Sequence, residues 1–387
     1  MAERVLITGA RAAAALDIAR DFLAAGWDVH LADCVKARMA RWSRLPAQHH
    51  RYPPPRQQGQ AFHAAIIALV EQQGIALVVP TCEEIFHLAA PALHAALGDR
   101  LFAPDLAMLR TLHDKLLFAR ACAAWDIPSP ESHAIGTTAD LRHYAATSRS
   151  WVFKPRFSRF GDRAIVGPDA RALAGIDVES GSPWMAQRRI EGEEHCFHAI
   201  AHSGTLTGFT AYRSDWRLGG GARYAFEPVA EARHRQLHAI ACRLVQEAGL
   251  HGQLACDVMV DAQGVPWLIE CNPRATSGVH LLSGSGDLAR AMSADVAIRQ
   301  MAERSAYLGP AMWLFGLPLA LRTRRFGAWR RLLSYGSDVI SRPGDRAPIA
   351  GALVDAARFW ATGWRRGLST NAATTFDIEW NGEEPCP

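Results

Sequence analysis

Apolar runs of strand length alternate with patterns of helical period at the start of the chain. The first predicted elements, in order, are a strand from Val5 to Thr8, a helix from Ala12 to Ala25, a strand from Val29 to Asp33, a helix from Ala61 to Gln73 and a strand from Ala76 to Pro80. Gly26 ends the first helix, and the Pro- and Gln-rich stretch from Tyr52 to Gln60 is a predicted loop. This order predicts a parallel α/β domain over residues 1–108.

A small α+β unit is predicted further along. Between Trp151 and Arg189 the pattern is strand, glycine-containing loop, strand, short helix and strand. The break Ile127-Pro-Ser-Pro130 is a candidate hinge before this unit. We therefore expect a fold of the α/β and α+β classes. Its second domain would cover residues 109–304, with a lid over about 130–189 and a catalytic subdomain over about 190–304.

Residues 305–387 form a predicted C-terminal extension. Its apolar run from Ala311 to Leu321 is eleven residues long, short of the roughly 20 that a membrane-spanning helix needs. We expect this run to be buried or at most interfacial. The segment from Arg358 to Arg366 is basic and aromatic, and Thr375 to Asn381 has the alternation of a terminal strand. Five of the twelve tryptophans follow residue 310, so the extension is expected to cover an apolar acceptor pocket, or to be an accessory structural layer.

Composition narrows the class of protein. The chain has 387 residues, 49% hydrophobic and 21% charged, which is enough for two or three globular domains. The net charge of +4 comes from dispersed arginines, so no nucleic-acid partner is expected. Eight scattered cysteines and a charged N-terminus without a signal-peptide pattern favour a cytoplasmic protein with reduced thiols and no membrane span.

The first βαβ pattern raises dinucleotide binding as one interpretation, because Asp33 lies where a ribose-binding acid would lie. However, the turn Gly9-Ala-Arg11-Ala-Ala-Ala14 keeps one of the three glycines of that fingerprint. NAD binding is therefore disfavoured.

The strongest chemical signal is a predicted hairpin near the middle of the chain. Strands from Leu254 to Val260 and from Trp267 to Cys271 flank the turn Asp261-Ala-Gln-Gly264. Alternation along the second strand projects Glu270 and Asn272 from one face, and the hairpin brings Asp257 beside them. Two carboxylates and an amide are hard oxygen ligands suited to Mg²⁺ shared with phosphates, and Arg274 adds an anion clamp. The alternative is a strand end exposed to solvent.

Further polar residues follow other predicted strands. Lys154 ends the strand that starts at Trp151 and precedes the loop Pro155 to Gly161, so it is a candidate phosphate contact. Thr81, Glu83 and Glu84 follow the strand that ends at Pro80, at the edge where α/β sheets bind ligands. Thr81 and Glu84 could equally form a helix capping box.

The motifs from about Leu109 to His280 together resemble the ATP-grasp superfamily, which includes carbamoyl phosphate synthetase, biotin carboxylase and D-alanine:D-alanine ligase. The resemblance lies in the hairpin, the Asp114-Lys115 pair, the Lys154 strand, the segment Trp184 to Glu194 and the glycine-rich loop Leu218 to Tyr224. It implies ATP as cosubstrate and Mg²⁺ as two ions, with Mn²⁺ as a substitute. The loop after Lys154 departs from the family, since Gly161 is its single glycine; Arg156, Ser158 and Arg159 are the alternative contacts.

The resemblance also implies residue roles. Asp257, Glu270 and Asn272 would hold the metal; Arg274 and Arg223 would act on the transferred phosphate. The nucleotide would contact Lys115, Lys154, Ser158, Gln187, backbone groups of Arg188 and Ile190, and, through its ribose, Glu194. Thr276, Ser277 and His280, with Thr81, Glu83 and Glu84, are candidate substrate contacts, although His280 could be a structural histidine.

The implied reaction is ATP-dependent carboxylate–amine ligation. A carboxylic acid would be activated as an acyl phosphate and captured by an amine, with release of ADP and phosphate. One alternative is a bicarbonate-activating carboxylase or carbamoyl-phosphate-forming enzyme, and another is a non-catalytic ATP-binding regulator. The expected partners are small-molecule acids and amines, and a homodimer is compatible with the sequence.

Overall fold

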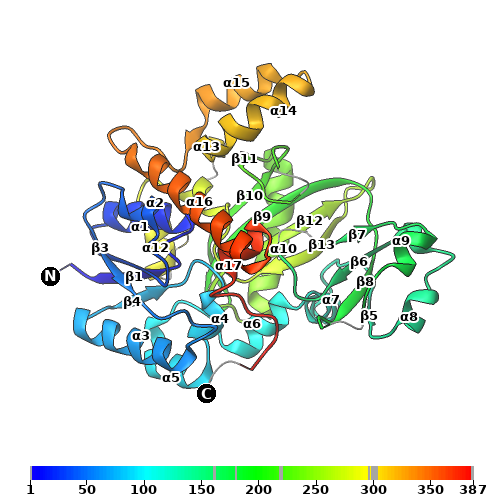
Figure 1. The fold of residues 1–387 in the computed structure, drawn as a ribbon, viewed down its shortest axis with the longest axis horizontal. Helices are drawn as coiled ribbons and strands as arrows, with labels where there is room; N and C mark the ends of the chain where they lie inside the picture. The colour runs from blue at the N-terminus through cyan, green and yellow to red at the C-terminus, as the bar shows by residue number, and fades with distance from the viewer. Residues whose placement is uncertain are drawn as a thin grey trace.

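The computed structural model describes residues 2–159, 163–178, 181–217, 221–294, 297 and 304–384. In this part of the chain the strands form three sheets with helices packed around them (Figure 1). The strand orders are β3-β2-β1-β4, β13-β12-β9-β10-β11-β14-β15 and β5-β8-β6-β7. The predicted α/β and α+β fold class is confirmed.

The N-terminal sheet is entirely parallel, as predicted. Its elements are β1 (Arg4–Thr8), α1 (Ala13–Ala24), β2 (Asp28–Asp33), α2 (Arg38–Arg41), β3 (Ala47–Arg51), α3 (Gly59–Gln73), β4 (Leu77–Val79), α4 (Glu84–Leu88), α5 (Pro91–Leu97) and η1 (Gly98–Arg100). Strand β3 was not predicted, because Ala47-Gln-His-His-Arg51 has no apolar run. It forms by backbone pairing with β2 at the sheet edge.

The lid unit is a four-stranded antiparallel sheet with short helices. Its elements and the helices before it are α6 (Leu106–His113), α7 (Lys115–Ala124), β5 (Ser132–Ile135), α8 (Thr138–Arg142), η2 (Ser148–Ser150), β6 (Trp151–Pro155), β7 (Ile165–Val166), α9 (Ala170–Ala174) and β8 (Trp184–Arg188). The order β6, loop, β7, α9, β8 is the predicted one, although Gly161 of the loop lies outside the described residues. The unit has a core of its own around Phe153 and Trp184.

The largest sheet forms the floor on which the candidate site is built. Its elements and associated helices are β9 (Glu193–His202), β10 (Thr205–Arg213), β11 (Ala225–Pro228), α10 (Glu231–Glu247), β12 (Gly252–Val260), β13 (Pro266–Asn272), α11 (Val279–Leu282), α12 (Asp287–Ser293), β14 (Ala306–Tyr307) and β15 (Ser337–Asp338). Helix α10 packs against one face through Leu237, Ala241 and Leu244, which are fully buried. Strands β12 and β13 pair as the predicted hairpin.

The C-terminal extension is mainly helical. It contains α13 (Gly309–Ala311), the π-helix η3 (Met312–Gly316), α14 (Leu317–Arg322), α15 (Phe326–Tyr335), α16 (Ala347–Arg366) and α17 (Thr370–Thr375). No helix in the described ranges is long and apolar enough to cross a membrane. The run from Ala311 to Leu321 is not simply buried, because several of its large apolar side chains are exposed.

The predicted terminal strand from Thr375 to Asn381 is wrong. The backbone N–H groups of Ile378 and Glu379 donate to the carbonyl of Thr375, so the segment turns back on α17. Its alternating apolar residues are nevertheless buried: Ile378 is 0% and Trp380 is 1% exposed. Alternation here reflects two side chains inserted into the N-terminal domain's core rather than a strand in a ladder.

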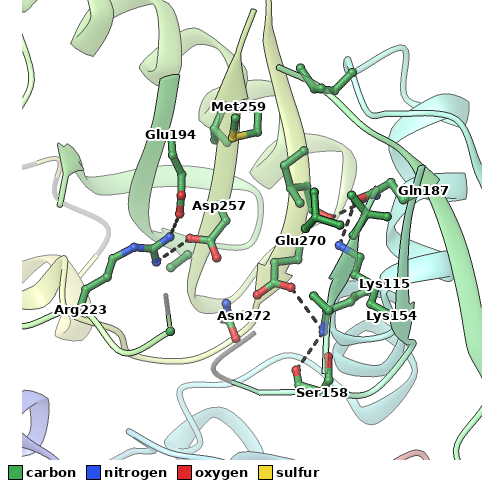
Figure 2. Close-up of a pocket in the computed structure, with 18 of the residues that line it drawn as sticks. Lys115, Lys154, Ser158, Gln187, Glu194, Arg223, Asp257, Met259, Glu270 and Asn272 are labelled. Carbon is green, nitrogen blue, oxygen red and sulfur yellow. Dashed lines mark hydrogen bonds and ion pairs between the residues drawn. The ribbon is translucent and has the colours of Figure 1, made fainter. Parts of the chain in front are cut away.

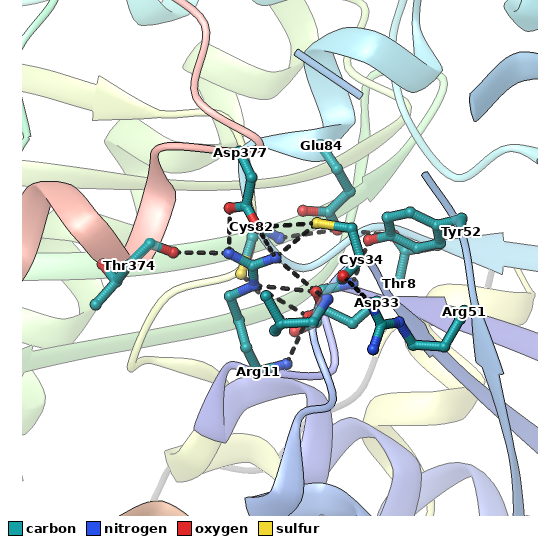
Figure 3. Close-up of polar contacts among 12 residues, drawn as sticks. Thr8, Arg11, Asp33, Cys34, Arg51, Tyr52, Cys82, Glu84, Thr374 and Asp377 are labelled. Atoms are coloured by element: carbon teal, nitrogen blue, oxygen red, sulfur yellow. Dashed lines mark hydrogen bonds and ion pairs between the residues drawn. The ribbon is translucent and has the colours of Figure 1, made fainter. Parts of the chain in front are cut away.

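This C-terminal segment crosses the carboxyl edge of the N-terminal sheet (Figure 3). Arg11, in the turn after β1, forms ion pairs of 2.6 Å with both Asp33 and Asp377. Asp33 also accepts from the backbone N–H of Arg11 at 2.9 Å and is 1% exposed. The Asp33 carboxylate, which could have suggested ribose binding, is therefore paired with Arg11 in a buried ion network.

Candidate active site

A cavity of about 790 Å³ lies between the lid strands, the β12–β13 hairpin and the loop that carries Arg223. Figure 2 shows charged side chains from these separate elements facing it. All the residues proposed from the sequence for metal and nucleotide are among those lining it: Lys115, Lys154, Ser158, Gln187, Arg188, Ile190, Glu194, Arg223, Asp257, Glu270, Asn272 and Arg274. Residues up to 162 positions apart, from Lys115 in α7 to Ser277 after β13, are gathered there, which only the tertiary fold can arrange.

The hairpin forms the floor of the cavity. Asp257 in β12 lies directly opposite Glu270 in β13, and the register shifts between Asp257 and Val258. Glu270 and Asn272 line the cavity, while Cys271 is 3% exposed and belongs to the core beneath, as the alternation predicted. The register shift leaves Ile269 without a partner, so Ile269 lines the cavity beside Glu270.

Two buried lysines face Glu270 from the lid side. Lys115 Nζ lies 3.4 Å from Glu270 Oε2 and donates to the carbonyl of Ser158 at 2.9 Å. Lys154 Nζ donates to Gln187 Oε1 at 2.9 Å. Burial lowers the pKa of Lys154 to about 8, although Glu270 acts in the opposite direction. Burial would raise the pKa of Glu270, but the two ammonium groups outweigh it and lower that pKa to about 2.

Local structure explains where Lys115 lies. Asp114 caps α7, its carboxylate accepting from the backbone N–H groups of Leu116 and Leu117 at 3.0 and 3.3 Å. The same carboxylate binds the guanidinium of Arg156, which follows β6. The cap therefore fixes the start of the helix to the lid strand, and Lys115 at the first helical position points into the cavity.

A second charged group lies on the opposite side. Arg223 pairs with Glu194 and, at 3.1 Å, with Asp257 Oδ1. Arg217 pairs with the other oxygen of Glu194 at 2.7 Å. Residues 218–220, which include two of the three glycines of the predicted loop, lie outside the described residues. The two arginines on either side of them converge on one carboxylate.

The oxygen ligands proposed for Mg²⁺ fit that ion chemically. Asp257 and Glu270 are carboxylates on paired strands, and Asn272 presents Oδ1 to Arg274, whose guanidinium lies 3.3 Å away. No group of three or more His, Cys, Asp or Glu side chains suited to a metal occurs in the part of the chain that the structure describes. A donor set of two carboxylates and one amide suits an ion that takes its remaining ligands from phosphate and water.

The turn between β8 and β9 supplies the wall where the purine is expected. The N–H of Arg188 is already bonded to the carbonyl of Glu131 at 2.8 Å. Gly192 lies so close to β12 that a Cβ there would collide with the carbonyl oxygen of Val260. Met259, two residues after Asp257 on the same strand face, also lines the cavity (Figure 2). The wall is therefore partly apolar, with backbone groups at its edge.

The residues after β4 have structural partners. Glu84 is 0% exposed and accepts from Thr8 Oγ1 at 2.7 Å and from the N–H of Thr81 at 3.1 Å. Thr81 donates to the carbonyls of Thr8 and Gly9 rather than capping α4, so half of the predicted capping box forms. Glu83 binds Arg159, which places it against the lid loop. None of the three lines the cavity, and the structural interpretation is favoured over substrate contact.

The candidates after β13 divide into two groups. Thr276 and Ser277 line the cavity beside Arg274. His280 is 7% exposed, and its Nδ1 lies 2.9 Å from Asp17 Oδ2 in α1. Burial would raise the pKa of Asp17, but the hydrogen bond with His280 helps lower it to about 2. The structural role considered for His280 is therefore favoured.

Two further predictions concern the loop after β6 and the C-terminal extension. Arg156 pairs with Asp114 and Arg159 with Glu83. Arg159 also lines the cavity, so its contact with phosphate stays a prediction. Among the described residues of the C-terminal extension, none lines this cavity, which favours the accessory layer over the cover of an acceptor pocket. Its last segment, which includes Asp377 and Trp380, packs on the N-terminal domain instead.

Met259, Ile269 and Arg217 are among the lining residues that the sequence did not indicate. Met259 and Ile269 were assigned to strands without a site role, although Met259 has the same alternation as Asp257. Arg217 precedes the predicted glycine loop and carried no signal of its own. Its part became visible only through its contact with Glu194.

Comparison with known proteins agrees with this geometry. Residues 112–278 match the family model of the ATP-grasp domain. A search of curated proteins with this sequence found no match. The chain contains an ATP-grasp domain.

Solved structures share the wider architecture. N5-carboxyaminoimidazole synthetase from Staphylococcus aureus, complexed with ADP, has a TM-score of 0.63 and 12% identity over 83% of this chain and 86% of its own. Biotin carboxylase from Campylobacter jejuni has a TM-score of 0.59 and 16% identity over 78% and 72%. L-amino acid ligase from Bacillus licheniformis has a TM-score of 0.56 and 15% identity over 72% and 69%. At these identities the likeness concerns the fold.

Proposed function

We propose that this protein is an ADP-forming ligase that joins a carboxylic acid to an amine through an acyl phosphate. The observation that carries the proposal is the pairing of Asp257 with Glu270 on the cavity floor between two opposed sets of cations. Carboxylates that bind a divalent ion, together with ammonium and guanidinium groups that neutralise phosphate, are what phosphoryl transfer requires of a protein.

Each residue has a defined part in this proposal. Asp257, Glu270 and Asn272 would hold Mg²⁺, which neutralises charge on the terminal phosphates when bound. Lys115, Lys154 and Ser158 would contact phosphate oxygens from the lid side. Gln187, the carbonyl of Arg188 and the N–H of Ile190 would recognise the purine, with Met259 against the ring. Glu194 would accept from the ribose hydroxyls, after exchanging its contacts with Arg217 and Arg223.

The proposed reaction has two steps, transfer of the phosphoryl group and capture of the acyl group by the amine. An oxygen of the substrate carboxylate attacks the γ-phosphorus, and the bond from that phosphorus to the bridging oxygen of ADP breaks. Arg223 and Arg274 would stabilise the charge on the transferred phosphoryl group. The amine nitrogen then attacks the acyl carbon, phosphate leaves, and the amine loses a proton. The protein supplies position and charge rather than covalent chemistry. Thr276 and Ser277 would contact the acid beside Arg274.

Interception of the acyl phosphate tests the proposal. With ATP, Mg²⁺ and hydroxylamine in place of the amine, a screen of amino acids and apolar carboxylic acids should give a hydroxamate, ADP and phosphate. Arg274→Ala should abolish it, whereas Arg243→Ala, an exposed residue of α10, should not. AMP with pyrophosphate as products, or a yield indifferent to Arg274, would refute the acyl-phosphate mechanism.

The fold neighbours also give the bicarbonate alternative a definite test. If bicarbonate, and no organic acid, stimulates ADP release, the protein is a carboxylating enzyme of the same fold. If no acid stimulates ADP release although ATP binds, the non-catalytic alternative holds. A cytoplasmic location is part of the proposal, supported by free thiols at all seven cysteines in the described ranges, including the directly opposed Cys256 and Cys271.

A further inference from the structure

The first helices of the C-terminal extension project from the body of the molecule (Figure 1). We call the segment from α13 to α15, residues 309–335, the arm. Its inner side has a core of its own: Met312 and Ala320 are fully buried, and Trp329 donates from Nε1 to the carbonyl of Met312 at 3.0 Å. The base of this core packs on Trp216 and Tyr224 of the main body. The arm therefore has a packed core and is attached to the main body through it.

The outer side of the arm exposes large apolar side chains, of which Trp313 also contacts the core edge-on through the ring of Trp329, with ring centroids 4.9 Å apart. Trp313 is 57%, Leu314 59%, Phe315 42% and Leu321 62% exposed. Leu314, the exposed Pro318 and Leu321 recur at spacings of four and three residues, which forms a stripe along η3 and α14. Several large apolar side chains exposed along one helical segment are typical of an interaction site.

The charge beside this stripe identifies the partner. The sequence from Ser305 to Ser337 contains five arginines and no acidic residue. Arg330 and Arg331 are exposed and make no ion pair with any described residue. Exposed Trp, Phe and Leu flanked by arginines are the composition of helices that lie in the plane of an anionic membrane surface, where arginine side chains extend to the headgroups.

A second copy of this chain is a poorer occupant. A two-fold contact would bring the same surface of both copies together, and with it the same arginines without acids to pair them. A spanning helix is also excluded for the arm, because η3 and α14 together have eleven residues, against the roughly 20 required. We propose that the arm docks the protein on a membrane surface rich in anionic lipids.

Vesicle sedimentation of the full-length protein tests this inference independently of any catalytic activity. The protein should bind phosphatidylcholine vesicles containing phosphatidylglycerol more tightly than pure phosphatidylcholine, and 0.5 M salt, used as roughly threefold physiological strength, should weaken the binding. Replacing Arg330 and Arg331 by Gln should reduce partitioning roughly 25-fold, about fivefold per charge. The double variant Trp313→Ser, Leu314→Ser should reduce it by about tenfold or more.

Matched controls separate the arm from general surface effects. Trp42→Ser, at another exposed tryptophan, and Arg142→Gln with Arg171→Gln, on the lid, should bind vesicles like the unaltered protein. Circular dichroism and thermal unfolding check that each variant is folded. Absence of binding to anionic vesicles, or unchanged binding by both arm variants, would overturn the proposal. A dimer that Trp313→Ser, Leu314→Ser converts to a monomer, without vesicle binding, would assign the surface to a second copy instead.

Discussion

Replacing Glu270 by Gln removes a carboxylate that faces two buried ammonium groups. At the observed 3.4 Å between Lys115 Nζ and Glu270 Oε2, two unit charges attract by about 5 kcal/mol at an effective dielectric constant of about 20. Desolvation offsets much of this attraction, and removal of one partner from a buried pair costs about 3–5 kcal/mol. The Glu270 side chain is 24% exposed, so we expect a loss of about 2–3 kcal/mol in unfolding free energy.

The pH dependence of this loss follows from the pKa of Glu270. That pKa is lowered from 4.5 to about 2 in the folded protein. A carboxylate with a lowered folded pKa contributes its stability above the unfolded pKa and loses it as the pH falls through the folded one. The difference between Glu270 and Gln should therefore be full at pH 7 and shrink between about pH 4 and pH 2. Urea unfolding without nucleotide measures it.

The catalytic effect of the same substitution should be larger. Loss of a carboxylate that holds the metal against the phosphates should reduce turnover roughly 10²-fold or more, measured as ADP release with the acid and amine found in the hydroxamate screen. The matched control is Glu247→Gln on the exposed side of α10, which should alter neither quantity. A Glu270→Gln protein within threefold of normal turnover would refute the assignment of the metal site, whatever its stability.

Three further predictions concern Lys154 in the lid, Glu194 in β9 and Trp380 near the C-terminus. Because the pKa of Lys154 is about 8, its charged fraction falls as the pH rises, and the ATP affinity measured by calorimetry should weaken roughly tenfold from pH 7 to pH 9. Lys154→Arg should remove this pH dependence. The same pH dependence in Lys154→Arg would contradict the contact of Lys154 with phosphate. Glu194→Ala should weaken ATP binding while NAD fails to bind the unaltered protein; tight NAD binding abolished by Asp33→Ala would reverse this interpretation. Trp380→Ala should cost about 3–5 kcal/mol in urea unfolding, because Trp380 is 1% exposed and stacks on Phe86 at 4.8 Å, whereas Trp360→Ala, at a 63% exposed position, should change stability by less than about 0.5 kcal/mol.

Removal of the whole C-terminal extension is expected to disturb the core of the N-terminal domain. Truncation after Arg304 would remove Ile378 and Trp380 from the core of the N-terminal domain and Asp377 from the Arg11 network. Such a protein would test folding rather than substrate choice. Substitutions on the arm, whose exposed residues lie outside these cores, leave the body intact.

The sequence by itself determined the elements with strong local periodicity and the site residues placed along single strands. Asp257, Glu270 and Asn272 could be assigned because strand side chains alternate and a short turn forces the two strands to pair. The helix cap at Asp114 and the lysine after it are equally local. These features depend on neighbours within a few residues or on one hairpin, so the local sequence is enough to predict them.

Only the tertiary structure decided the roles of residues whose partners are distant in sequence. Thr81, Glu84 and His280 are polar residues that sequence places near a ligand edge, but burial and long-range hydrogen bonds make them structural. Thr375 to Asn381 has a strand's alternation, yet it pairs with no strand in the described ranges, and its backbone bonds return to α17. Arg217 was assigned no role until the fold placed it against Glu194. Burial and charge pairing between segments distant in sequence carry no local pattern, because the free energy that selects them arises only when the segments meet.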